Sequence, residues 1–323
     1  MIANGCVTPP SMTQPAEPTE AHPTVFGPVA LARSLRGVPD TIVLPVPERL
    51  LAVYAVVTPD PPAETALYSG EGLAIDVVPV DDAPLPPSPL LRAMGADAPA
   101  LAAYDSATHA VLVRAVGSAQ FPPQHEFAAY ASARAIAEMS EGVVVDTVIP
   151  RIVTRARAVD ESFRLADWMV LPHSLEPPEQ GGLLWFTSKG MSRFGLPELQ
   201  SHGIPEPLAN AWGAVLTGIG LVLLRDHEQA LAADPTTALR EVPAQHSVSL
   251  RDIAAAYSDE ARFGADSDLD TAREFRVELD PSTSEAADSF LTVQAPDHFG
   301  GTTDQWAAEV VKALFTDIGR HDT

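Results

Sequence analysis

LLWFTSKGMSRFGLPEL, at residues 183–199, combines an apolar run with two glycines and a proline. The first part, 183–187, is a short run of large apolar residues next to a pair of glycines, which is typical of a buried strand. Gly190 accepts a positive φ without a Cβ clash, so the chain can turn sharply there. Met191 and Phe194 are three residues apart and can reach one surface of a helical turn. We call 183–199 the signature segment.

The second half of the signature segment predicts a further turn. Pro197 fixes φ where that turn starts, and Glu198 lies near its positive end. We interpret the segment as a structural corner with Met191 and Phe194 in the core, in preference to a ligand-binding loop, because such glycines and prolines usually serve backbone geometry. Ser192 is expected to cap the turn with its hydroxyl. The candidate binding or structural residues are Trp185, Thr187, Gly190, Met191, Phe194, Gly195, Pro197 and Glu198.

These residues resemble a known family. Thr187 followed by Gly190-Met191, and then Phe194-Gly195-x-Pro197-Glu198-Leu199, is similar to a bacterial family catalogued as domain of unknown function 4261. The strand-like run at 109–113, the valines at 143–145 and Trp168 also suit its pattern. The resemblance covers about residues 105–233 and implies a bacterial protein. It carries no catalytic residue over.

The charge of the chain restricts its partners. Forty-three acidic residues against 20 basic ones give a formal net charge of −23. Phosphate backbones and anionic lipid surfaces repel such a protein, so nucleic-acid binding and peripheral membrane binding are disfavoured. We expect any charged partner to be a basic protein surface.

The single cysteine, Cys6, rules out a disulfide within the chain and a zinc site built from several thiolates. The N-terminus lacks the basic region and apolar run of a signal peptide, which predicts a cytoplasmic protein. The longest uncharged stretch, 207–224, is diluted by glycines, and we expect a core helix there. No motif predicts a cofactor.

Three regions are expected along the chain. Residues 1–40 are rich in proline and predict a disordered tail. Residues 41–245 predict an α+β core domain with a mixed or antiparallel sheet and packed helices, because strand and helix patterns alternate irregularly. Residues 246–323 predict an acidic α+β extension packed on that core.

Hydrophobic patterns place the elements. Strands are expected at 50–58, 73–80, 109–116, 143–149, 183–187, 275–279 and 289–293. Helices are expected at 124–141, 206–232, 250–257 (opened by Ser249 and Asp252) and 303–315, with a strand or short helix at 165–171. On the helical wheel of 124–141, the apolar half contains Phe127, Ala128, Ala131, Ala135, Ile136 and Met139.

No catalytic motif is complete. A nucleophile elbow needs Gly-x-Ser-x-Gly, and the segment around Ser192 is one residue too long. Histidine spacing for a zincin helix and the endings of phosphate loops are also missing. We therefore expect a non-catalytic binding or interaction module. The alternative is a serine-type hydrolase that uses Ser192, with His173 or His202 as the base.

Overall fold

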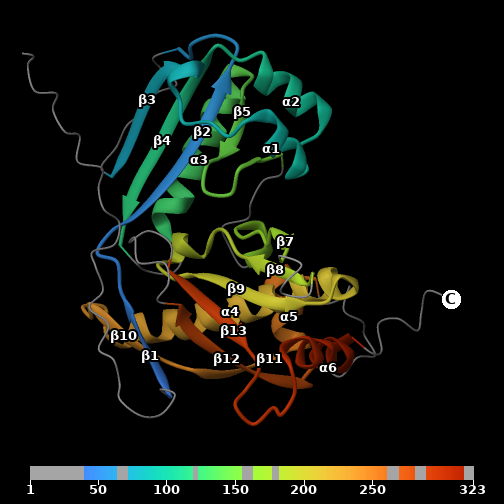
Figure 1. Cartoon of the computed structure of the whole chain (residues 1–323). Coiled ribbons are helices and arrows are strands. Elements are labelled where there is room, and N and C mark those ends of the chain that lie inside the picture. Colours follow the sequence, from blue (N-terminus) through green and yellow to red (C-terminus); the bar gives the residue numbers. More distant parts are fainter. Residues whose placement is uncertain are drawn as a thin grey trace, which may run out of the picture.

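The strands and helices form two lobes in the computed structural model (Figure 1). The structure describes residues 40–63, 72–118, 123–154, 163–176, 182–259, 269–280 and 289–315. The predicted tail lies outside these residues, apart from residue 40. The fold class is α+β, as the sequence predicts: several helices pack on antiparallel and mixed sheets.

The upper lobe in Figure 1 contains a five-stranded antiparallel sheet of order β3-β4-β2-β5-β6. Helix α3 packs on one face, and α1 and α2 pack on the other, so both faces of the central strands are buried. The elements are β2 (Leu50–Thr58), β3 (Leu73–Pro79), the 3-10 helix η2 (Val80–Asp82), α1 (Ser88–Ala93), α2 (Ala98–Asp105), β4 (His109–Gly117), α3 (Gln124–Ser140), β5 (Val143–Asp146) and β6 (Arg151–Ile152).

The lower lobe contains a six-stranded mixed sheet of order β11-β12-β13-β9-β8-β7, in which β13 and β9 are parallel. A separate two-stranded sheet pairs β1 with β10. The strands are β1 (Thr41–Pro45), β7 (His173–Leu175), β8 (Leu184–Thr187), β9 (Glu198–Ile204), β10 (Leu239–Pro243), β11 (Gln245–Ser249), β12 (Ala272–Asp280) and β13 (Phe290–Gln294). The segment from residue 246 onward thus adds strands to the same sheet as the signature segment.

The helices of the lower lobe are α4 (Ala209–Ala233), α5 (Leu250–Tyr257), α6 (Thr303–Phe315) and the 3-10 helices η3 (Leu165–Asp167), η5 (Met191–Phe194) and η6 (Glu206–Leu208). α4 is the central helix, and its Trp212 packs edge-on against Trp306 of α6 at 5.2 Å between ring centroids. Glu206–Ala233 is long and apolar enough to cross a membrane by length and composition, and 56% of its most apolar window is buried inside the protein. It serves here as a core helix.

Most expected elements are present, and the helix over Leu250–Tyr257 begins with the full capping box of Ser249 and Asp252. The strand expected at 143–149 ends early, because the Asp146 carboxylate accepts hydrogen bonds from the N–H groups of residues 148 and 149 and turns the chain. Phe127 and Ile136 of the expected apolar half of α3 are buried, but the prediction was wrong about the rest of its buried face. Ala128, Ala131, Ala135 and Met139 are exposed, whereas Glu126, Ala129, Tyr130 and Ala133 are buried.

Candidate functional site

The signature segment runs from β8 through a sharp turn into η5 and then into β9. Gly190 has φ = 122°, and a Cβ built there would lie 2.2 Å from the carbonyl oxygen of Trp168. Only glycine fits this position, as the sequence predicts. Gly195 ends η5 in the left-handed region, with φ = 77°. The Thr187 N–H donates to the carbonyl oxygen of Pro172 and holds β8 beside β7.

Glu198 organises the turn. Its buried carboxylate accepts hydrogen bonds from the backbone N–H groups of Gly190 (2.9 Å), Met191 (3.1 Å) and Ser192 (3.2 Å). It also accepts one from the hydroxyl of Ser188 at 2.5 Å. The free N–H groups at the start of η5 are therefore satisfied by a carboxylate of the same chain.

This arrangement corrects two expectations. Pro197 and Glu198 do not open a helical turn, because β9 begins at Glu198 and its side chain reaches back to the preceding η5. Ser192 contributes its N–H to the turn, and no hydrogen bond of its hydroxyl is found among the described residues. The hydroxyl that serves the turn belongs to Ser188, which also accepts from the N–H of Leu199 at 2.7 Å.

Met191 and Phe194 are buried, as the structural interpretation predicts. A Cβ added at Gly220 of α4 would lie 3.5 Å from the sulfur of Met191, so the two elements pack closely. Phe194 meets Phe163 edge-on at 6.0 Å between ring centroids. The corner is thus part of the main core of the lower lobe.

Between these two core residues, Arg193 points into the upper lobe. Its Nη1 donates to Glu126 Oε2 at 3.0 Å and to the Tyr54 hydroxyl at 2.7 Å, and its Nη2 contacts Asp146. The Tyr54 hydroxyl donates to Glu126 at 2.8 Å. Burial alone lowers the pKa of Arg193, but Asp146 and Glu126 outweigh it and raise that pKa above its usual value. This buried cluster connects the two lobes.

His125 adjoins this cluster at the start of α3. Burial and the positive charge of Arg193 lower the pKa of His125 to about 4. The ring is therefore neutral at neutral pH. His125 and its neighbour Glu126 are both buried, and the contact of Glu126 with Arg193 accounts for a charged residue on the inner face of α3.

A second feature lies at the open end of the six-stranded sheet. Trp185 stacks on His202 with ring centroids 5.4 Å apart and planes 8° apart. His202 Nδ1 lies 3.1 Å from Glu176 Oε1, which also accepts from the N–H of Gly203. Leu175 on β7 is 66% exposed and Trp185 is 37% exposed. We call Leu175, Trp185 and His202 the edge surface.

The three groups of the hydrolase alternative have separate surroundings. His173 contacts the ring of Phe186 in a tilted arrangement, with 4.9 Å between ring centroids, and His202 contacts Trp185 and Glu176. In the described part of the chain, neither histidine forms a hydrogen bond with Ser192. No group of three or more metal-ligating side chains is found in that part of the chain either.

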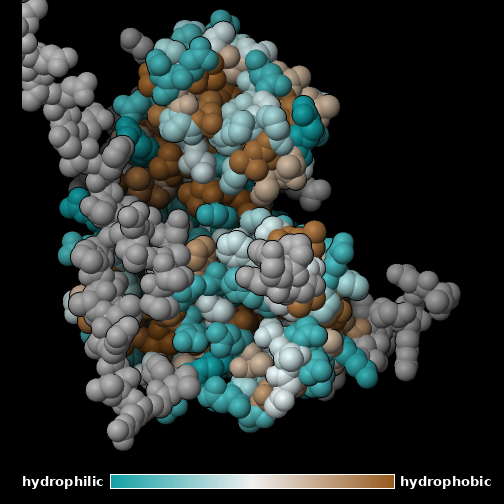
Figure 2. Space-filling model, viewed as in Figure 1, coloured by the Kyte–Doolittle hydropathy of each residue, from teal (hydrophilic) through white to brown (hydrophobic). Residues whose placement is uncertain are grey.

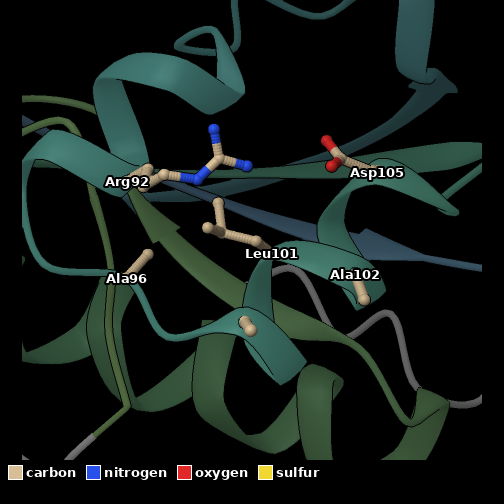
Figure 3. A pocket seen from close by; sticks show the side chains of 6 residues that line it. Arg92, Ala96, Leu101, Ala102 and Asp105 are labelled. Atoms are coloured by element: carbon tan, nitrogen blue, oxygen red, sulfur yellow. The ribbon is translucent and has the colours of Figure 1, made fainter.

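The upper lobe has a pocket of about 370 Å³ between α1 and α2 (Figure 3). Arg92 and Asp105 lie on opposite sides of it, with Leu101 beneath. Both charged side chains are exposed, and small alanines form much of the remaining wall.

Sequence reasoning missed the residues that join the lobes, namely Tyr54, Glu126, Asp146 and Arg193. The available signal was one arginine placed between Met191 and Phe194, both of which were expected in the core. Its partners lie 47 to 139 residues earlier in the chain, and no local pattern connects them. No family model, curated protein or solved structure matches this chain.

Proposed function

We propose that this chain is a non-catalytic interaction module that binds an extended basic segment of a partner protein along β7. The observation that carries the proposal is the edge surface, where Leu175 and Trp185 are exposed beside the last strand of a sheet. In Figure 1, β7 lies at the end of the lower lobe that faces the upper lobe, and Figure 2 shows a notch between the lobes on the right of the view.

Among the described residues, β7 is the end strand of its sheet, and part of its backbone points away from β8. On the side toward β8, the carbonyl oxygen of Pro172 accepts a hydrogen bond from the N–H of Thr187. The N–H of Glu176 donates to the carbonyl oxygen of Leu183. In an antiparallel pair, the backbone groups of successive residues point alternately toward the neighbouring strand and away from it. The N–H and C=O groups of His173 and Leu175 therefore point away from β8. A peptide that adds to this edge can pair with them, as in strand addition to other open sheets.

The side chains of the edge surface favour a partner segment in which apolar and basic residues alternate. Leu175 is opposite Leu184, on the face that continues into the core, so it offers an apolar contact. Trp185 is on the other face, opposite Ser174, with one side of its indole covered by His202. The exposed side of an indole attracts a guanidinium or ammonium group. A segment that alternates apolar and basic residues matches both faces.

Charge selects a basic partner over a second copy of the chain. Two copies paired edge to edge bring two net charges of −23 together and repel each other. A basic segment is attracted, and its association is faster at low salt. The carboxylate of Glu176 beside His202 adds a local negative group.

The serine hydrolase stays the alternative function. The present geometry favours it less, because the described residues show no hydrogen bond between Ser192 and either histidine, and Ser192 lies in a turn held by Glu198. The interaction module needs only surfaces that are already exposed.

The experiment uses a capped seven-residue peptide of alternating valine and arginine as the probe, with a valine–glutamate peptide as its matched control. We expect the arginine peptide to shift the NMR signals of 173–175 and of Trp185, and to bind less tightly as salt rises. Trp185→Ala and Leu175→Gln should weaken binding at least tenfold.

Leu239→Gln is the matched control, because Leu239 is 59% exposed on β10, in the other sheet. That variant should bind as the wild type does. The proposal fails if the arginine peptide leaves the edge surface unshifted, or if both leucine variants lose binding equally.

A further inference from the structure

The pocket between α1 and α2 presents two opposite charges that are not paired with each other. In Figure 3 the guanidinium of Arg92 and the carboxylate of Asp105 face each other across Leu101. Among the described residues, the side chain of Arg92 forms no ion pair and no hydrogen bond. Asp105 accepts a hydrogen bond from the Ser88 hydroxyl through Oδ1. The pocket therefore has a donor group at one end and an acceptor group at the other.

Hydrogen bonds hold the two helices that form the pocket. Gly95, with φ = 91°, turns the chain directly after the end of α1. The carboxylate of Asp97 then caps α2 by accepting from the N–H of Ala100 at 2.8 Å. At the other end of α2, the Tyr104 hydroxyl donates to the carbonyl oxygen of Pro86. The pocket is thus formed before any ligand arrives, which lowers the free-energy cost of binding.

The surface between the two charges is apolar. Leu101 is 5% exposed and forms the base, and the rest of the lining consists of the small side chains of Ala96, Ala98 and Ala102. An apolar group that enters the pocket is removed from water against this surface. A volume of about 370 Å³ is near the lower end of the range for small-molecule sites, so the ligand has to be small.

The charges favour a ligand that carries both signs. A simple anion is attracted by Arg92, but Asp105 and the net charge of −23 repel it. A simple cation is attracted by Asp105 and repelled by Arg92. A molecule with one carboxylate and one ammonium group meets an opposite charge at each end. It carries no net charge, so the acidic protein as a whole does not repel it.

We infer that this pocket binds a small zwitterion with an apolar side chain, of the amino-acid or dipeptide class. The carboxylate of the ligand accepts hydrogen bonds from the guanidinium of Arg92, and its ammonium group donates to the carboxylate of Asp105. Its apolar side chain lies on Leu101. The site is independent of the proposed partner at β7, because it belongs to the other lobe.

The test is an NMR titration of the wild type with L-leucine and with the dipeptide alanyl-leucine, which differ in the distance between their charged ends. Isocaproate, which lacks the ammonium group, and isopentylamine, which lacks the carboxylate, are the matched control ligands. We expect at least one zwitterion to shift the backbone signals of Ala98, Leu101 and Asp105 and to saturate, with a Kd on the order of 1 mM. The zwitterion that binds more tightly identifies the length of the ligand.

Both control ligands should bind at least about threefold more weakly than that zwitterion, because each lacks one ion pair and exposed ion pairs are modest. Arg92→Gln and Asp105→Asn should weaken its binding by a similar factor. Both side chains are exposed, so the variants keep the fold. Arg114→Gln is the matched control variant, because Arg114 is exposed in the same lobe and paired with Asp76, and it should bind as the wild type does.

Three results would overturn the inference. The first is that neither zwitterion gives a saturable shift at the pocket. The second is that isocaproate or isopentylamine binds as tightly as the zwitterion. The third is that Arg92→Gln and Asp105→Asn bind the zwitterion as tightly as the wild type does.

Discussion

Arg193 of the lower lobe and Glu126 of the upper lobe form a fully buried ion pair, with 3.0 Å between Nη1 and Oε2. Arg193 belongs to η5, and the Glu198 carboxylate stabilises the turn at the start of η5. The geometry of that turn therefore determines where the guanidinium lies in the upper lobe. Asp146 lies on the opposite side of the same guanidinium. The signature segment therefore has two structural roles: it closes the core of one lobe and fixes that lobe to the other.

Arg193→Met should destabilise the protein by about 3 to 5 kcal/mol, because it leaves two buried carboxylates without a counter-charge. Urea unfolding measures the loss. Adding Glu126→Gln and Asp146→Asn to Arg193→Met should recover part of the stability, since the uncompensated charges are then gone.

Arg134→Met is the control for that variant. Arg134 pairs with Glu138 on the exposed side of α3, and its loss should cost no more than about 0.5 kcal/mol. Equal effects of the two arginine variants would mean that the ion pair between the lobes contributes little.

Glu198→Gln should cost roughly 2 to 4 kcal/mol, because it removes the charge and turns an amide donor toward backbone N–H groups. Ser192→Ala should change stability by no more than about 0.5 kcal/mol, since its hydroxyl serves no bond in the described structure. Thermal unfolding of both variants shows whether the side chain of Glu198 or that of Ser192 stabilises the turn. A larger loss for Ser192→Ala than for Glu198→Gln would contradict the assignment of the cap to Glu198.

Met191→Ala and Phe194→Ala should each cost about 2 to 5 kcal/mol, because both side chains are buried in the core of the lower lobe. Met139→Ala is the control, because Met139 is exposed on α3 and should unfold as the wild type does. Urea midpoints measure all three. Unchanged midpoints for the two core variants would make the signature segment a surface feature.

The sequence was informative where the cause is local. Gly190 was expected to turn the chain through a positive φ, and the fit against Trp168 requires it. The capping box of Ser249 and Asp252 predicted the start of α5 correctly. These features depend on neighbours within a few residues, so composition and spacing are sufficient to find them.

The parts that were missed depend on distant residues. From its local sequence, Glu126 has the pattern of an exposed helix residue. It is buried because it binds Arg193, which lies 67 positions later in the chain. For the same reason the buried face of α3 could not be found from its own pattern. β9 was also missed, because its alternation is interrupted by Ser201, whose hydroxyl accepts from the indole of Trp212 in the core. Tertiary contacts overrode the local pattern in both places.

His125 should make stability depend on pH. Its pKa is lowered to about 4 by burial and by Arg193, below the ordinary histidine value of 6.5. Between these values the unfolded chain binds a proton that the folded protein does not, so stability rises with pH in this window. The contribution of this group is fully present above about pH 6.5 and is lost as the pH falls toward 4.

His125→Gln removes this titration and should reduce the pH dependence by about 2 to 3 kcal/mol between about pH 7.5 and pH 4.5. Urea unfolding of wild type and variant at both pH values gives the difference, in which the titrations of other groups largely cancel. His298→Gln, at an exposed histidine, should retain the pH dependence of the wild type. If His125→Gln also retains it, then His125 binds protons equally well in the folded and unfolded states, and burial beside Arg193 does not hold it neutral.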